Sequence, residues 1–215
     1  MKEYFMEFYQ KVFKENMQKK FIIIFSIIIT IALLGGSMFN KEVLESLGIS
    51  TKTTLIFKDT LLKEIITVGL LILSSIVPYM YTPYIAIPVI GLLVGIEMFT
   101  APHITIFVLI SGLLKIMAYS FAIVLGGMLC KKTTIMYRKT SVKNDEIINT
   151  KRDMYLAVGS KKAKEKVEKM DKKIKEKIKK LEAEEEGIIL NGQVFLILSI
   201  LVLIFITLSV LVKFI

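Results

Sequence analysis

The chain has 215 residues, of which 54% are hydrophobic, with a formal net charge of +10 and one cysteine. Its apolar residues lie in long blocks, several of which reach the ~20 residues that a helix needs to cross a bilayer core. This distribution excludes an ordinary soluble domain, and the single Cys130 excludes an internal disulfide framework.

The basic residues lie beside the apolar blocks, as the positive-inside rule expects for a membrane protein. The net charge is therefore attributed to membrane topology, and nucleic acid is not expected as a partner. The sequence predicts an all-α, multi-pass protein of the cell (cytoplasmic) membrane with about five transmembrane helices. Its N-terminus is expected in the cytoplasm and its C-terminus outside.

The chain begins with an amphipathic segment, residues 1–20, whose aromatic and aliphatic side chains fall on one helical face. Two interpretations remain open: a helix on the membrane surface, or one packed on the cytoplasmic ends of the spans. Residues 21–130 are predicted to form a four-helix transmembrane region. Its first span, Phe21–Phe39, resembles a retained signal anchor, and an outer connection, residues 40–63, follows it.

The second to fourth spans are expected at 64–80, 84–100 and 104–130. Gly91 and Gly95 form a small-x-x-x-small pattern in the third span, which favours close packing of two helices. Gly112, in the fourth span, is also assigned to helix packing.

Pro102 and His103 lie between the third and fourth spans and are predicted to form a turn at the outer interface. A metal ligand or a pH sensor is the functional alternative for His103. The chain contains no second histidine and only one cysteine, so a zinc site is not expected there.

Two charged residues interrupt the apolar runs of the third and fourth spans, Glu97 and Lys115. Side chains lean toward the N-terminus of their helix, so in an antiparallel hairpin these two lean toward each other. Ionisable groups inside a span are costly and usually face protein or water. Two interpretations follow: an ion pair that fixes the packing of the hairpin, or a pathway for ions, protons or substrate. We favour the ion pair.

Residues 131–187 carry 18 Lys plus Arg and 11 Asp plus Glu, and they are predicted to form a cytoplasmic arm. A helix is expected over residues 160–186, with an apolar stripe at spacings of three and four. We interpret this stripe as a surface for partner proteins; its members are Val167, Met170, Ile174, Ile178 and Leu181. A fifth span, residues 188–215, completes the chain.

The pieces Phe21–Phe39, Leu62–Tyr79, Gly91–Gly95, Pro102-His103 and Gly112–Gly127 together resemble the stage II sporulation protein M family of bacterial and archaeal membrane proteins. The resemblance covers about the first two-thirds of the chain. It implies a non-catalytic membrane scaffold, comparable to the anchor of a complex used in sporulation.

No motif of an enzyme active site is found, and neither a catalytic residue nor a cofactor is expected. The sequence thus favours a scaffold that recruits other proteins into a membrane complex. Membrane lipids and a homo-oligomer are further expected partners. The alternatives are a small transporter or channel subunit that uses Glu97 and Lys115, a membrane-insertion factor, and a holin-like pore.

Overall fold

The computed structural model describes residues 17–38, 43, 46, 57–100, 106–156, 161–186 and 192–214. Within these ranges the regular structure is entirely helical, as expected, and no strand is present. The elements are α2 (Gln18–Met38), α4 (Phe57–Leu73), the 3-10 turn η2 (Ser74–Ile76), α5 (Thr82–Ile85), α6 (Ile87–Phe99), α7 (Ile106–Leu156), α8 (Lys161–Glu186) and α9 (Gly192–Lys213). The predicted amphipathic helix at 1–20 lies largely outside the described residues, and Pro102 and His103 lie wholly outside them.

Three of the described helices, α2, α7 and α9, are long and apolar enough to cross a membrane. The all-helical prediction is confirmed for the described residues, and these three helices are compatible with a membrane protein. The other two expected spans are shorter: α4 has 17 residues, and α6 has 13. Helix α4 also begins within the predicted outer connection, because residues 57–63 are already helical. The expected count of about five spans is therefore not established by helix length and composition.

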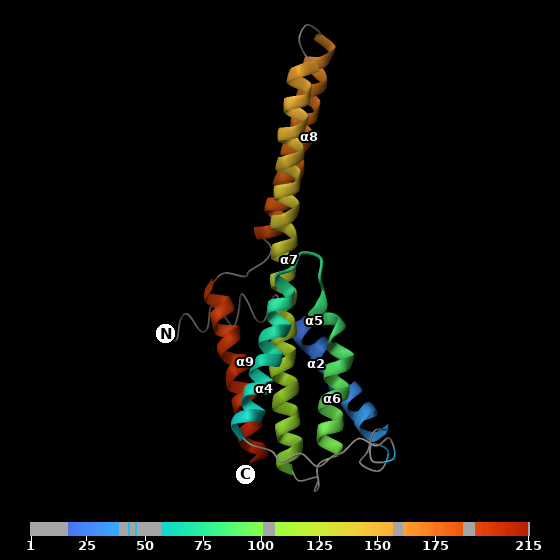
Figure 1. Ribbon diagram of the computed structural model, residues 1–215, viewed down its shortest axis with the longest axis vertical. Helices are drawn as coiled ribbons and strands as arrows, with labels where there is room; N and C mark the ends of the chain where they lie inside the picture. Colours follow the sequence, from blue (N-terminus) through green and yellow to red (C-terminus); the bar gives the residue numbers. More distant parts are fainter. Residues whose placement is uncertain are drawn as a thin grey trace.

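Helix α7 forms the centre of a bundle (Figure 1), with α2, α4, α5, α6 and α9 packed around its first half. Its segment from Ile116 to Cys130 contains more of the fully buried side chains than any other helix does. The most extensive contacts join α7 to α9 and α2 to α6. Helix α7 therefore fixes where the surrounding helices lie.

The same helix leaves the bundle and continues as half of a long arm (Figure 1). The composition changes from apolar to basic at Lys131, but the backbone stays helical to Leu156. No glycine or proline occurs between Met128 and Leu156, so nothing in this stretch interrupts the helical hydrogen bonds. The expected arm is thus partly an extension of the fourth predicted span.

Helix α8 returns along α7 and completes a helical hairpin (Figure 1). The described members of its apolar stripe, Met170, Ile174, Ile178 and Leu181, are half-buried, whereas most of the helix is exposed. Half-buried residues of α7 recur at matching spacings of three and four at Lys139, Val142, Glu146 and Asn149. This pattern is typical of two helices packed along a seam. The stripe predicted for partners therefore packs within the chain, although the side chain of Val167 lies outside the description.

An ion pair between Lys139 and Glu185 joins the two helices at the foot of the arm. The hydrogen bond from Lys139 lowers the pKa of the Glu185 carboxyl from its ordinary value of 4.5. A lowered folded-state pKa stabilises the hairpin above the unfolded-state value, and this contribution is lost as the pH falls through the folded value. Acidification below about pH 4.5 should therefore loosen the foot of the arm.

Electron paramagnetic resonance can check this expectation with spin labels at Thr140 and Glu182 in a Cys130→Ser background. We expect the distance distribution to broaden as the pH falls below about 4.5. The matched variant Glu185→Gln should remove this dependence. A distribution that broadens equally in that variant would contradict the assignment to the Lys139–Glu185 pair.

Candidate functional site: a charge network shared by four helices

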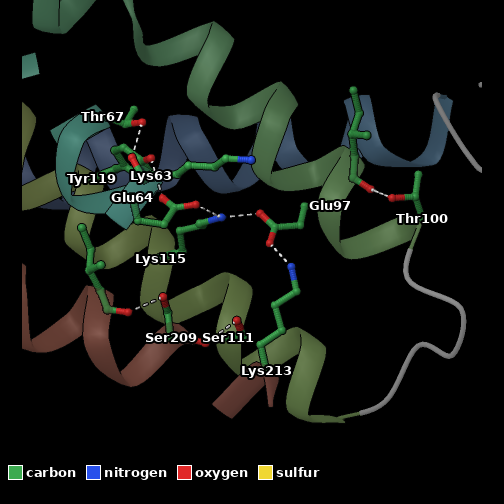
Figure 2. A network of polar contacts seen from close by, with 12 residues as sticks. Lys63, Glu64, Thr67, Glu97, Thr100, Ser111, Lys115, Tyr119, Ser209 and Lys213 are labelled. Atoms are coloured by element: carbon green, nitrogen blue, oxygen red, sulfur yellow. Dashed lines mark hydrogen bonds and ion pairs between the residues drawn. The ribbon is translucent and has the colours of Figure 1, made fainter. Parts of the chain in front are cut away.

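The structure brings Glu97 and Lys115 together as an ion pair between α6 and α7 (Figure 2). Lys115 is only 7% exposed, and its Nζ also lies 2.6 Å from Oε1 of Glu64 on α4. Lys213, near the end of α9, pairs with the other oxygen of Glu97. The four groups form an alternating row of charges that begins at Glu64 and ends at Lys213.

Neutral groups complete the network. The hydroxyl of Tyr119 donates a hydrogen bond of 2.8 Å to Oε2 of Glu64, one turn along α7 from Lys115. One turn in the other direction, Ser111 Oγ donates to the backbone carbonyl of Ser209 on α9, at 2.7 Å. Helix α7 is therefore tied to three neighbours by polar contacts within an apolar bundle.

The charges of the network balance, with two carboxylates and two ammonium groups. Isolated charges in a span are expensive, and their cost falls when each is paired with an opposite charge and hydrogen-bonded. Among the described residues, no buried side-chain nitrogen or oxygen lacks a hydrogen-bond partner. The charge network is therefore suited to holding the helices together, because each charged group is paired with one of opposite charge.

The cavity beside this network is small. It has a volume of about 20 Å³ and is lined by Val94, Glu97, Met98, Val108, Ser111, Gly112, Lys115 and Lys213. A single water needs roughly 10–15 Å³ measured in this way. The cavity thus has room for about one water, and it offers no space for an organic substrate.

Two members of the network, Glu64 and Lys213, are not expected from the sequence. Glu64 lies at the edge of the second predicted span, and Lys213 lies near the end of the fifth. Charged residues at the ends of apolar runs ordinarily extend into the headgroup region, so their positions alone give no reason to pair them. The signal that could have found them is charge balance. Glu97 and Lys115 lie within the predicted spans, and a residue of opposite charge near a span end is available to each: Lys213 for Glu97 and Glu64 for Lys115.

The predicted packing glycines lie where two helices approach closely. A Cβ atom on Gly95 would lie 2.2 Å from the carbonyl oxygen of Ala32, and one on Gly91 would lie 2.8 Å from Ile31 of α2. At Gly112, an added Cβ would lie 2.3 Å from the sulfur of Met98 on α6. Gly91 and Gly95 therefore face α2, whereas Gly112 faces α6.

Comparison with known proteins adds no assignment: neither a family model, nor a curated protein, nor a solved structure matches the chain. Within the described residues, no group of three or more histidine, cysteine, aspartate or glutamate side chains is placed to hold a metal ion. The network and the arm are therefore the features on which a functional proposal rests.

Proposed function

We propose that this chain is a non-enzymatic integral membrane scaffold, similar in role to that implied by its resemblance to stage II sporulation protein M. In this proposal the bundle anchors the chain in the cell membrane, and the α7–α8 arm recruits partner proteins into a complex. The observation that carries the proposal is the continuity of α7, a single 51-residue helix that is both the bundle's centre and half of the arm. A helix with this continuity holds a binding surface at a defined distance from the membrane.

The arrangement of the helices supports a five-span topology. Helix α4 leads directly into η2, and α5 is separated from α6 by Ala86 alone, so each pair makes a nearly continuous helical passage. Helices α2, α6 and α9 run toward the end of the bundle opposite the arm, whereas α4 and α7 run toward the arm (Figure 1). Placing the basic arm in the cytoplasm puts the N-terminus inside and the C-terminus outside.

The charge network supports the scaffold over a transporter or channel. In the part of the chain that the structure describes, Glu64, Glu97, Lys115 and Lys213 pair with each other, and the adjoining cavity has room for about one water. A transport site needs charges that exchange partners with a substrate or ion along a path. These pairs instead join α4, α6, α7 and α9.

The packing of the arm changes where a partner is expected to bind. Since the apolar stripe of α8 faces α7, a partner protein would contact the outer surface of the arm. That surface includes the exposed Lys172 and Lys173 of α8, and Ile147 and Ile148 of α7, which are 54% and 64% exposed. An exposed isoleucine pair among charged residues is typical of the apolar centre of an interface with a polar rim.

Shortening the arm tests this proposal. Replacing residues 147–176 with a short Gly-Ser turn removes Ile147, Ile148, Lys172 and Lys173, and it keeps the Lys139–Glu185 pair and the whole bundle. We expect partner proteins that co-purify in mild detergent from the native host to be lost, as measured by quantitative mass spectrometry. The control inserts the same Gly-Ser turn between Leu156 and Lys161, which leaves both arm helices complete. Partners that remain bound to the shortened chain would exclude the arm as the recruiting element.

A further inference from the structure

A cleft lies at the foot of the arm, where α7 and α8 meet the turn that follows η2. It has a volume of about 320 Å³ and is lined by Tyr79, Tyr137, Arg138, Ser141, Val142, Lys177, Lys180 and Leu181. Volumes of roughly 300–1,000 Å³ are typical of small-molecule sites. The cleft is therefore large enough for a polar headgroup, unlike the cavity beside the charge network.

All the charged residues that line this cleft are cations. Arg138 comes from α7, and Lys177 and Lys180 come from α8, while no carboxylate is among the described lining residues. Glu184 of α8 lies near enough to influence Arg138 through its charge, but it does not line the cleft. Three cations that converge without a lining counter-charge favour an anionic ligand, and arginine with lysine is the combination that binds phosphate.

Tyr79 orients the arginine. Nε of Arg138 donates a hydrogen bond of 3.1 Å to the Tyr79 hydroxyl, and the guanidinium carbon lies 5.5 Å from the centre of the same ring. The terminal nitrogens of the guanidinium are its remaining donors. Tyr137 packs edge-on against Tyr79, with ring centres 6.0 Å apart. The orientation of the Arg138 guanidinium is therefore fixed by its contacts with Tyr79, which in turn packs against Tyr137.

The backbone of Tyr79 is itself strained. Its φ of 63° lies in the left-handed region, which a tyrosine rarely adopts. The strained conformation is held by a hydrogen bond of 3.0 Å from the Tyr79 N–H to the Thr134 hydroxyl on α7. Strain of this kind persists where surrounding contacts enforce it, and it concentrates at ligand sites.

The position of the cleft favours a membrane lipid as the source of the anion. Lys131 and Lys132 mark the end of the apolar run of α7, and Thr134, which binds Tyr79, lies just beyond them. Tyr79 and Tyr81 are half-exposed at this level, where tyrosine rings characteristically meet lipid headgroups. The cleft thus lies just beyond the apolar run of α7, at the level expected for headgroups on the side of the arm.

We propose that this cleft binds the phosphate of an anionic phospholipid headgroup through Arg138, Lys177 and Lys180. A soluble phosphate ester presents the same chemistry, so the test includes both sources. The inference goes beyond the scaffold proposal and does not depend on it, because it requires no protein partner.

The test uses the full-length protein in detergent micelles, with native mass spectrometry to count bound ligand. The probes are dihexanoyl phosphatidylglycerol, dihexanoyl phosphatidylcholine, glycerol phosphate and a short polyglutamate peptide. The variant Lys177→Gln/Lys180→Gln removes two lining charges from an exposed face of α8. Its matched control, Lys175→Gln/Lys179→Gln, removes the same charge from the same helix outside the cleft.

We expect phosphatidylglycerol to bind the wild-type protein and the control with affinities within about twofold. The Lys177→Gln/Lys180→Gln variant should bind it about tenfold more weakly, because charge-assisted contacts are lost. Arg138→Lys, which keeps the charge but not the planar fork, should also weaken binding. A circular dichroism melt of each variant separates loss of the ligand from loss of the fold.

The arms of the experiment separate the two sources. Binding of phosphatidylglycerol that exceeds binding of glycerol phosphate supports a lipid ligand, whereas equal binding supports a phosphate site with a soluble source. The proposal is overturned by equal weakening in the control variant, by polyglutamate binding as tightly as the lipid, or by no phosphate-bearing probe binding the folded wild-type protein.

Discussion

Replacing Lys115 with methionine is expected to lower the free energy of unfolding by about 3–5 kcal/mol. Lys115 is 7% exposed, and its ammonium group is shared by the carboxylates of Glu64 and Glu97. Methionine fills a similar volume but leaves both carboxylates facing an apolar side chain. Unfolding of the purified protein by heat or by denaturing detergent would measure the loss.

Charge balance provides a sharper form of this test. The network divides into the pairs Lys115–Glu64 and Lys213–Glu97. The double variant Lys115→Met/Glu64→Gln removes one complete pair and leaves the other neutral, so it should be more stable than Lys115→Met alone. The side-chain amide oxygen introduced by Glu64→Gln would still accept the hydrogen bond from Tyr119. The exposed neighbour Lys63→Met serves as the control and should change stability little. If the double variant were the less stable one, the network would not be held by charge pairing.

Adding a single methyl group at Gly95 is expected to destabilise the bundle by about 1–3 kcal/mol, as overpacking of a tight contact does. In Gly95→Ala the new Cβ would lie 2.2 Å from the Ala32 carbonyl oxygen, which belongs to the backbone of α2 and cannot rotate away. Helices α2 and α6 would have to separate along their contact. The melting temperature in detergent and the fraction of monodisperse protein would both fall.

Gly69 offers a matched control for this substitution because a Cβ atom there would have no neighbour within 4 Å. Gly69→Ala is expected to be neutral or to stabilise α4 by up to about 1 kcal/mol, through the higher helix propensity of alanine. The same chemical change should therefore destabilise the protein at Gly95 but not at Gly69. Equal melting temperatures for the two variants would contradict close packing of α2 on α6.

The sequence indicated a helical membrane protein because apolar blocks of this length are typical of membrane-spanning helices and rare in other structures. It also suggested Glu97 and Lys115 as a pair, because charges within an apolar run attract notice. Glu64 and Lys213 escaped attention because charges are ordinary at the ends of such runs. Which span ends meet is decided by tertiary packing, and the spacing of residues along one helix contains no information about it.

The prediction of the arm was incomplete because it, too, depends on which residues of separate helices meet. The apolar spacing in α8 predicted one side of a seam, but the matching positions on α7 include Lys139, Glu146 and Asn149, which no apolar pattern identifies. The lack of glycine and proline between Met128 and Leu156 is consistent with the continuity of α7. The change of composition at Lys131 suggested a boundary where the backbone has none.

The unbroken α7 also has a mechanical consequence. From Lys115 to Leu156 the helix rises by about 60 Å, at 1.5 Å per residue. A lateral displacement of the tip by about 5 Å corresponds to a tilt of only about 5° over that length. Such a tilt is transmitted to the point where Lys115 joins α4 and α6, and through Glu97 to α9. A force applied at the tip of the arm would thus act on the ion pairs within the bundle.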